Sequence, residues 1–156
     1  MNARVIDNVI TVDVGVDTAA HAANDCVFQP VELVDIANAG GCAIIQSVVV
    51  IDYDDQGAVL DLVFLSDSVG VGANNATFAI SDNNASKVLG HVRVASADYL
   101  DLDQNQIGTA TNCGLLVKPD PNDGGSDRSI WMAGKTTGTP TYAGGVLTVR
   151  VGVLRG

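Results

Sequence analysis

Segment 16–27, VDTAAHAANDCV, gathers the kinds of side chain that metal ions and hydrolases use. These are His21, Cys26, Asp17 and Asp25. Imidazole, thiolate and carboxylate groups bind a metal only where they converge on one ion, and the single other histidine, His91, lies far along the chain. A turn needs no such convergence, because an aspartate carboxylate can bind backbone N–H groups close to it in sequence. We therefore expect segment 16–27 to form a turn and not a metal site.

Segment 52–63, DYDDQGAVLDLV, matches the calcium loop of EF-hand proteins in part. Asp52, Asp54 and Gly57 occupy its first, third and sixth positions. The last position requires a bidentate glutamate but holds Val63, and the flanking residues have the pattern of strands instead of helices. The match therefore fails as an EF-hand.

Segment 101–112 is a second partial match, with Asp101 and Asp103 in place but Gln106 where the loop needs glycine. A calcium site of another geometry stays open for this segment. If Asp101 and Asp103 form such a site, calcium should raise the melting temperature of the protein.

Signatures of nucleotide binding and of hydrolysis are incomplete. Segment 129–136, SIWMAGKT, ends like a phosphate-binding loop, but Ser129 replaces the opening glycine and no helix is predicted after Lys135. The chain has no G-x-S-x-G motif, and its two histidines have no evident partner serine for a Ser-His-Asp arrangement. We therefore expect no enzymatic activity, no cofactor and no catalytic metal.

The composition predicts a β protein. Seventeen of the eighteen acidic residues are aspartate, which favours turns, whereas glutamate favours helix interiors. The net charge of −10, with scattered basic residues, argues against nucleic-acid binding. No run approaches the ~20 apolar residues of a membrane-spanning helix, and the N-terminus lacks the pattern of an export signal. Three cysteines without a C-x-x-C pair predict free thiols in a reducing compartment.

Period-two alternation of apolar residues predicts about eight strands. The clearest are 9–16, 43–53, 58–66, 91–99, 114–119, 129–135 and 145–154. The turn residues DDQG predict that 43–53 and 58–66 form a hairpin, and a single short helix is expected over 82–89. We therefore expect one all-β domain over 1–156, a β-sandwich or jelly-roll-like fold, with 1–8 as an N-terminal arm or an extra edge strand.

The order of several segments resembles a family of tailed-bacteriophage proteins. The segments are VDTAAHAANDCV, then 45–67, 78–102 and GLLVKP, and finally 138–154 with its TPTY turn. In this order they are similar to head decoration proteins, also called cement proteins, over nearly the whole chain. The chain departs from that pattern in its acidic, glycine-rich loop at 120–127 and in its three cysteines.

The resemblance implies a non-enzymatic protein that folds in the host cytoplasm and binds the major capsid protein on the outer surface of the virion. A homotrimer is favoured at threefold junctions, and a dimer on twofold axes is the alternative. A carbohydrate- or host-binding module on a virion is the alternative function. The candidate partner contacts are Arg4, Val5 and Ile6 in the N-terminal segment, with Pro140 and Tyr142 in the TPTY turn.

Overall fold

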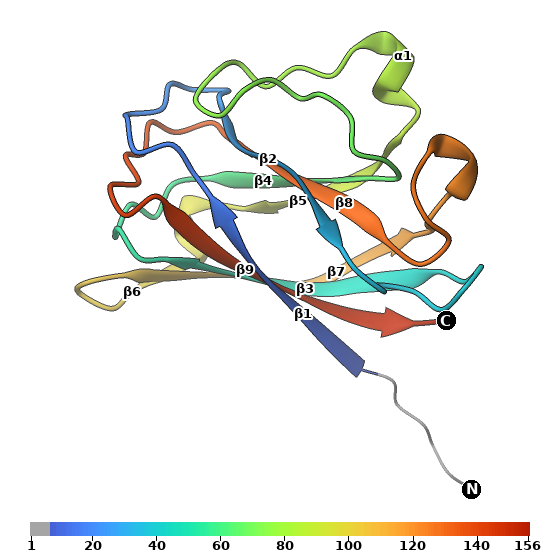
Figure 1. The fold of residues 1–156 in the computed structure, drawn as a ribbon. Helices are drawn as coiled ribbons and strands as arrows, with labels where there is room; N and C mark the ends of the chain where they lie inside the picture. The colour runs from blue at the N-terminus through green and yellow to red at the C-terminus, as the bar shows by residue number, and fades with distance from the viewer. Residues whose placement is uncertain (1–6) are drawn as a thin grey trace, which may run out of the picture.

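Alternating apolar residues build nine strands, and these form two antiparallel sheets packed face to face (Figure 1). The structure is a computed structural model that describes residues 7–156. The five-stranded sheet has the order β1 (Asp7–Gly15), β9 (Val146–Arg155), β3 (Ala43–Asp52), β7 (Gln106–Val117) and β6 (Tyr99–Asp101). The four-stranded sheet has the order β2 (Cys26–Leu33), β8 (Ile130–Thr136), β4 (Leu60–Leu65) and β5 (Val88–Val94). The predicted all-β sandwich is confirmed.

The core lies between the two sheets and is built from the inward-facing residues of each alternation. In β9, Val149 and Val151 are fully buried while Arg150 between them is exposed, as the alternation predicts. The largest fully buried side chains include Tyr142, Phe28, Phe64, Leu33, Ile36 and Ile45. Full burial of one such side chain stabilises the fold by about 1.5–3 kcal/mol, so this layer holds the two sheets together.

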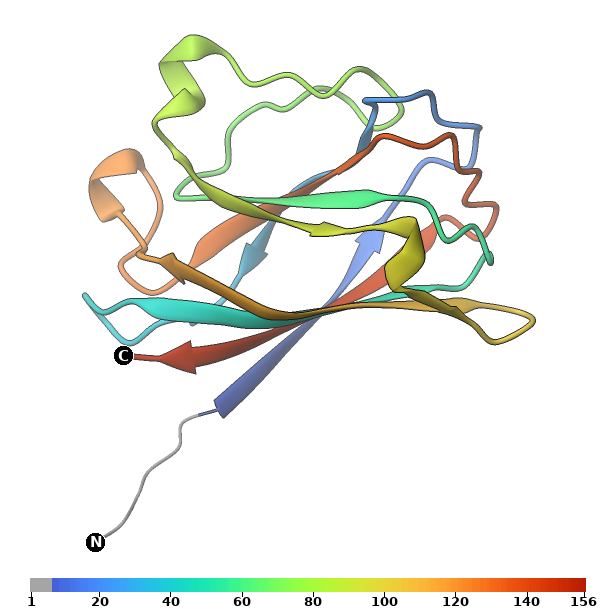
Figure 2. The same cartoon turned by 180° about the vertical axis from the view of Figure 1, so that it is seen from behind.

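Consecutive strands cross repeatedly from one sheet to the other. β1 and β3 lie in the five-stranded sheet, whereas β2 and β4 lie in the four-stranded sheet, and β8 and β9 separate in the same way. The order β1-β9-β3-β7 against β2-β8-β4-β5 is that of an eight-stranded jelly roll, to which the short β6 adds one edge strand. Figure 2 shows β5 and β7 side by side, where the two sheets approach each other at one margin of the sandwich.

The predicted hairpin between 43–53 and 58–66 is wrong. β3 pairs with β7 and β9, whereas β4 pairs with β5 and β8, so the two strands lie in different sheets. The chain between them crosses from one layer to the other. Asp52 holds this crossing by accepting backbone N–H groups from it, and Gly57 supplies a positive φ of 54°. Turn chemistry therefore identifies a bend here, but not which strands pair.

The predicted helix over 82–89 ends early. α1 (Asp82–Ala85) is a single turn, closed where the N–H of Lys87 donates to the Asn84 carbonyl, and strand β5 begins at Val88. Isolated helices of this length are unstable, whereas pairing with β4 gives Val88 and the residues after it a place in the sheet. Within residues 7–156, no helix has the length and apolar character needed to span a membrane.

Sequence patterning misses β2, β6 and the first half of β7. In β2 the alternation is broken by Pro30, and its pairing with β8 has two register shifts. Bulges of this kind place consecutive residues out of the period-two pattern. β6 has three residues, which is too few for any periodicity to be recognised.

The outer face of the four-stranded sheet is covered by the chain itself. Residues 66–81 run across it, above β4 and β8 in Figure 1. Beneath them lies a second, smaller core made of Cys26, Leu65, Val69, Val71 and Ala133, with Val63, Phe78, Ile80 and Trp131 packed against it. The middle of this outer face, over β4 and β8, is therefore covered, whereas His91 and Arg93 of β5 are exposed.

We expect the protein to lose stability above about pH 10. Burial, with a smaller contribution from Asp52, raises the pKa of Tyr99 and Tyr142 above the usual range. At such a pH the unfolded chain releases these phenol protons and the folded chain keeps them. Their stabilising contribution is therefore constant at neutral pH and is lost progressively as the pH rises from about 10, the pKa of the unfolded chain, toward the raised values. Urea unfolding at pH 8 and pH 11 should show the loss, and Tyr142→Phe should reduce it; equal loss in both proteins would contradict this assignment.

Candidate functional site

Segment 16–27 connects β1 to β2 as a series of turns. The Asp17 carboxylate accepts the N–H of Ala19 at 2.7 Å, and the Asp25 carboxylate accepts the N–H of Ala22 at 2.7 Å. The predicted turn is therefore confirmed. Across the described residues, 7–156, no three His, Cys, Asp or Glu side chains are grouped so that they could hold a metal ion.

His21 has a packing role in this turn. The side chain is 3% exposed, and its ring packs edge-on against Tyr142 with the ring centroids 5.6 Å apart. Its backbone N–H donates to the Pro140 carbonyl at 2.9 Å. Neither ring nitrogen has a hydrogen-bond partner among the described residues. The contacts of His21 are therefore those of an apolar ring.

His21→Phe is expected to change the free energy of unfolding by less than about 1 kcal/mol, because no hydrogen bond is lost and the phenyl ring occupies a similar place. Urea unfolding of the variant and of the parent protein measures this difference. A destabilisation of several kcal/mol would show instead that the imidazole nitrogens bind a partner.

The cysteines are not arranged as nucleophiles. Burial, together with the charge of Asp25, raises the pKa of the Cys26 thiol to about 11, and burial also raises the pKa of Cys113. A reactive cysteine needs a lowered pKa, because the thiolate is the attacking form. Cys26, Cys42 and Cys113 are all free thiols, as the sequence predicts.

Asp52 uses its carboxylate for the fold. The side chain is 1% exposed and accepts the backbone N–H groups of Asp54 at 3.0 Å, Gln56 at 2.9 Å and Gly57 at 2.8 Å. These three bonds organise the crossing between the two sheets. The partial resemblance of 52–63 to a calcium loop therefore reflects a structural turn.

Asp101 and Asp103 lie in the connection between β6 and β7. The carboxylate of Asp101 accepts the N–H of Asp103 at 2.7 Å, and Asp103 has a positive φ of 77°. Two carboxylates in an exposed turn provide few of the six to eight oxygen ligands that calcium takes. We therefore expect no change in melting temperature on addition of calcium. A clear rise that Asp101→Ala removes would instead establish a calcium site.

Segment 129–136 coincides with strand β8 except for its first residue. β8 pairs with β2 and β4, and a turn follows Thr136. A phosphate-binding loop requires a helix N-terminus whose N–H groups face the phosphate, and residues 137–145 form no helix. Segment 129–136 therefore lacks the helix N-terminus of a phosphate-binding loop, and Lys135 lies within a strand.

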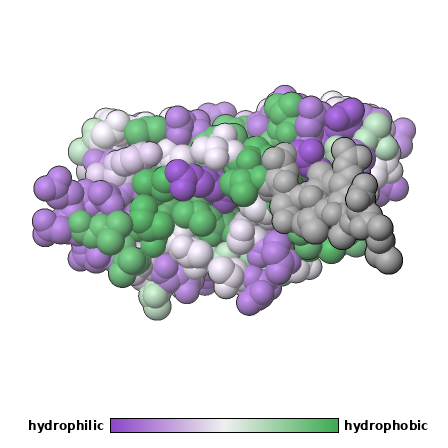
Figure 3. Space-filling model, turned by 90° about the horizontal axis from the view of Figure 1, so that it is seen from below, coloured by the Kyte–Doolittle hydropathy of each residue, from purple (hydrophilic) through white to green (hydrophobic). Residues whose placement is uncertain are grey.

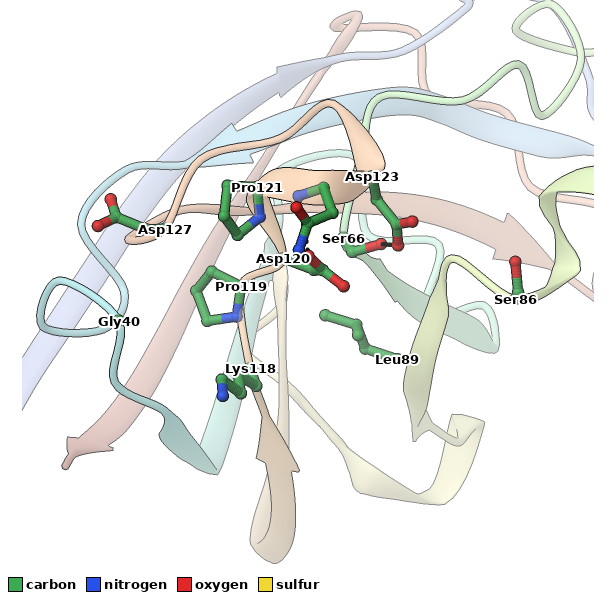
Figure 4. Close-up of a pocket in the computed structure, with 11 residues that line it drawn as sticks. Gly40, Ser66, Ser86, Leu89, Lys118, Pro119, Asp120, Pro121, Asp123 and Asp127 are labelled. Carbon is green, nitrogen blue, oxygen red and sulfur yellow. Dashed lines mark hydrogen bonds between the residues drawn. The ribbon is translucent and has the colours of Figure 1, made fainter.

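A cavity of about 470 Å³ opens between β5 and the connection from β7 to β8 (Figure 4). The hydroxyl of Ser66 donates to the Asp123 carboxylate at 2.6 Å, and the Asp120 carboxylate accepts the N–H of Asn122 at 2.9 Å. These bonds hold loop 120–127 in place. The lining of the cavity contains neither histidine nor cysteine, and the carboxylates of Asp120 and Asp123 both take part in these loop bonds.

The outer face of the five-stranded sheet is not covered by any described segment and displays apolar side chains (Figure 3). Leu154, Ile44 and Leu116 lie side by side across β9, β3 and β7, and they are 42%, 36% and 62% exposed. We call these three residues the apolar row. Val9 on β1, also on this face, is 61% exposed. This face contrasts with the covered outer face of the four-stranded sheet.

A second group of apolar residues lies toward the other end of this face. Ile51, Ile107 and Leu100 align across β3, β7 and β6, and Leu100 is 64% exposed. Between the two groups, Arg150 of β9 lies beside Val49 of β3. Figure 3 shows hydrophobic residues on this face with a hydrophilic group among them, and further hydrophilic residues at its margins. The face therefore displays two apolar groups with a cation between them.

Two predicted partner contacts are corrected by the structure. Tyr142 is 1% exposed in the main core, and Pro140 is buried as well. The TPTY turn packs its proline and tyrosine inward, so only Thr139 and Thr141 are exposed there. An aromatic residue in a turn therefore indicated an anchor of the fold and not a contact surface.

The predicted contacts in the N-terminal segment, Arg4, Val5 and Ile6, lie outside the described residues and stay predictions. Asp7 and Asn8, expected in the arm or in an extra edge strand, belong to edge strand β1. Sequence reasoning also misses the apolar row. Its signal was present in 43–53, where apolar residues occupy both faces of a predicted strand.

No protein family and no curated protein matches this sequence. Among solved structures, the chain is similar to that of the infectious bursal disease virus VP2 subviral particle, at 15% identity and a TM-score of 0.37. The match covers 96% of this chain and 32% of that one, so the chain spans about a third of its length.

Two plant viruses give weaker matches. Desmodium yellow mottle tymovirus matches at 8% identity and a TM-score of 0.27, over 98% of this chain and 82% of that one. Maize chlorotic mottle virus matches at 11% identity and a TM-score of 0.27, over 94% and 92%. Similarity at these levels assigns the chain to none of these proteins.

Proposed function

We propose that the chain is a non-enzymatic structural protein of a phage virion, which binds the major capsid protein at subunit junctions and stabilises the head as a decoration or cement protein. The uncovered outer face of the five-stranded sheet carries this proposal. Its apolar row is contiguous and a second apolar group lies beyond Arg150, whereas residues 66–81 cover the middle of the other sheet's outer face. Contiguous exposed apolar surface marks sites of protein binding. The sequence resemblance to head decoration proteins supports the major capsid protein as the partner.

Binding alone accounts for the stabilising effect. A protein that binds the assembled shell and not its separated subunits favours assembly by mass action, by about 2.7 kcal/mol per site when its free concentration is 100 times the dissociation constant. This mechanism needs no catalytic group. It agrees with the structural roles of His21, Cys26 and Asp52.

The charge distribution suits a protein that is abundant before assembly and sits on the outside of the head. The chain has a net charge of −10, which keeps copies apart in solution and away from nucleic acid. Arg150 places a cation near the centre of the outer face. Docking by this face would leave the acidic loops directed to solvent.

Heads of the virus that encodes this chain, assembled without it, provide the test. Adding the purified chain is expected to give saturable co-sedimentation with the heads and a higher temperature of head disruption. An unrelated acidic protein of similar size is the control. Absence of co-sedimentation at micromolar concentrations of the chain would contradict the proposal.

The alternative, a virion-surface carbohydrate- or host-binding module, has less support. Sugar binding uses exposed aromatic rings, but Tyr142 is buried, Tyr99 is mostly buried and Trp131 packs against the second core. Tyr53 is 48% exposed, and its hydroxyl is hydrogen-bonded to Thr148. One exposed ring is a poor platform for a sugar.

The oligomer remains to be assigned within this proposal. A threefold junction favours a homotrimer, as expected from the sequence resemblance, and a twofold axis favours a dimer. The outer face is compatible with the trimer and with the dimer, because it needs only to stay accessible in the oligomer. The free edge of β1 supports the dimer.

A further inference from the structure

The four edge strands of the sandwich differ in their protection against pairing with another chain. β2 contains Pro30 and two register shifts, β6 has only three residues, and β5 has a register shift beside Gly90. Proline, bulges and short length are the usual features that keep an edge strand from pairing. β1 has nine residues, pairs with β9 without a register shift and contains no proline. It is the unprotected edge of the described structure.

The hydrogen-bonding groups on the free edge of β1 follow from its pairing with β9. The N–H of Val16 donates to the Gly145 carbonyl at 3.0 Å, so the backbone N–H and C=O groups of Val16 are directed toward the side of β9. Direction alternates along an antiparallel strand, which directs the N–H and C=O groups of Val9, Thr11 and Asp13 away from β9. These groups therefore lie on the side of β1 opposite to β9, which is the one described strand that pairs with β1.

We propose that two copies of the chain pair antiparallel through β1, about a twofold axis at Thr11, and join their five-stranded sheets into one. In this register Thr11 lies opposite the partner's Thr11, and all nine residues of β1 are paired. Val9 then lies opposite the partner's Asp13, and Asp7 lies opposite the partner's Gly15. Asp13 thus faces an apolar residue, whereas a register with Asp13 on the axis would set its carboxylate against the partner's Asp13.

Side-chain burial supports a second copy as the occupant. Ile10 and Val12 direct their side chains toward the core but are only partly buried, because none of the described strands lies beyond β1. In the dimer, Ile10 lies opposite the partner's Val12, and Val12 lies opposite the partner's Ile10. Pairing therefore covers both side chains. Asp13 is already held by the Thr148 hydroxyl at 2.6 Å, which keeps its charge away from the edge. The two outer faces then form one continuous surface.

Mass in solution and a cross-link test the pairing. The wild-type chain should have twice the mass of its 16.0 kDa unit by light scattering. Thr11→Cys, in a background with Cys42→Ser and Cys113→Ser, should form a disulfide dimer on oxidation, because Cα atoms opposite each other in such a pair are about 5.5 Å apart. Thr109→Cys in the same background is the matched control, since Thr109 is exposed on the same face but lies on β7, with β9 and β3 between it and β1. It should stay unlinked.

Thr11→Pro removes an N–H that faces the free edge and leaves the pairing of β1 with β9 intact, so it should yield a folded monomer. Thr11→Lys places two like charges on the axis and should also yield a monomer. If the proline variant unfolds, the lysine variant still tests the pairing of the two β1 strands. A monomeric or trimeric wild-type chain, or a folded Thr11→Lys dimer, overturns the pairing. Head binding by such a chain would still support the proposed function, and a dimer that fails to bind heads would overturn only that function.

Discussion

Replacing Ile44 and Leu116 together by aspartate is expected to weaken binding to heads by at least about 100-fold. The two side chains are adjacent across β3 and β7 and are 36% and 62% exposed. Each change removes apolar contact area and would bury an unpaired carboxylate in the interface. The two carboxylates face each other across β3 and β7, so the free energy of unfolding should fall by about 1–3 kcal/mol, which leaves the protein folded. Co-sedimentation titrations with heads measure the binding, and urea unfolding measures the stability.

The matched control for this variant lies elsewhere on the surface. Val34 and Val88 are 57% and 37% exposed, so their replacement by aspartate adds the same charge at similar exposure. Val88 begins β5 in the other sheet, and Val34 follows β2. The control variant should bind like the wild type. Equal loss in both double variants would mean that added negative charge, and not the apolar row, determines binding.

Asp52→Ala is expected to lower the free energy of unfolding by about 3 kcal/mol or more. It removes a buried carboxylate that accepts three backbone N–H groups at 2.8 to 3.0 Å. Those donors lose their partner in the segment that carries the chain from β3 to β4. For a domain of this size the change corresponds to a fall in melting temperature of roughly 10 °C. Scanning calorimetry measures this shift.

Asp101→Ala is the control for that substitution. Its carboxylate is exposed and accepts a single N–H, that of Asp103. The expected cost is below about 1 kcal/mol, because water can replace the lost acceptor. Similar costs for the two variants would show that the bonds to Asp52 do not stabilise the crossing.

The strands that alternate regularly are the ones that sequence predicts well. In β9 the inward-facing valines and the outward Arg150 are predicted residue by residue, since one face of that strand is buried. Such an alternation does not predict which other strand a strand pairs with. The segments 43–53 and 58–66 therefore have correct strands but the wrong pairing, because Asp52 directs the chain to the other sheet instead of back along β3.

The candidate site was harder to predict than the fold. Whether Ile44 and Leu116 are buried depends on whether another segment covers their face, and residues 66–81 cover the four-stranded sheet instead. Which of the two sheets this segment covers depends on contacts between residues that are far apart in the sequence. Tyr142 failed as a predicted contact for the same reason, because its turn folds inward onto His21.

A reconstruction of heads decorated with this chain, by electron cryomicroscopy, tests the central claim most directly. The account predicts that the outer face of the five-stranded sheet lies against the major capsid protein, with Ile44, Leu116 and Leu154 in the contact. The segment 66–81, over the four-stranded sheet, should face solvent. Decorated heads in which 66–81 or loop 120–127 meets the shell, and the apolar row faces solvent, would contradict the account.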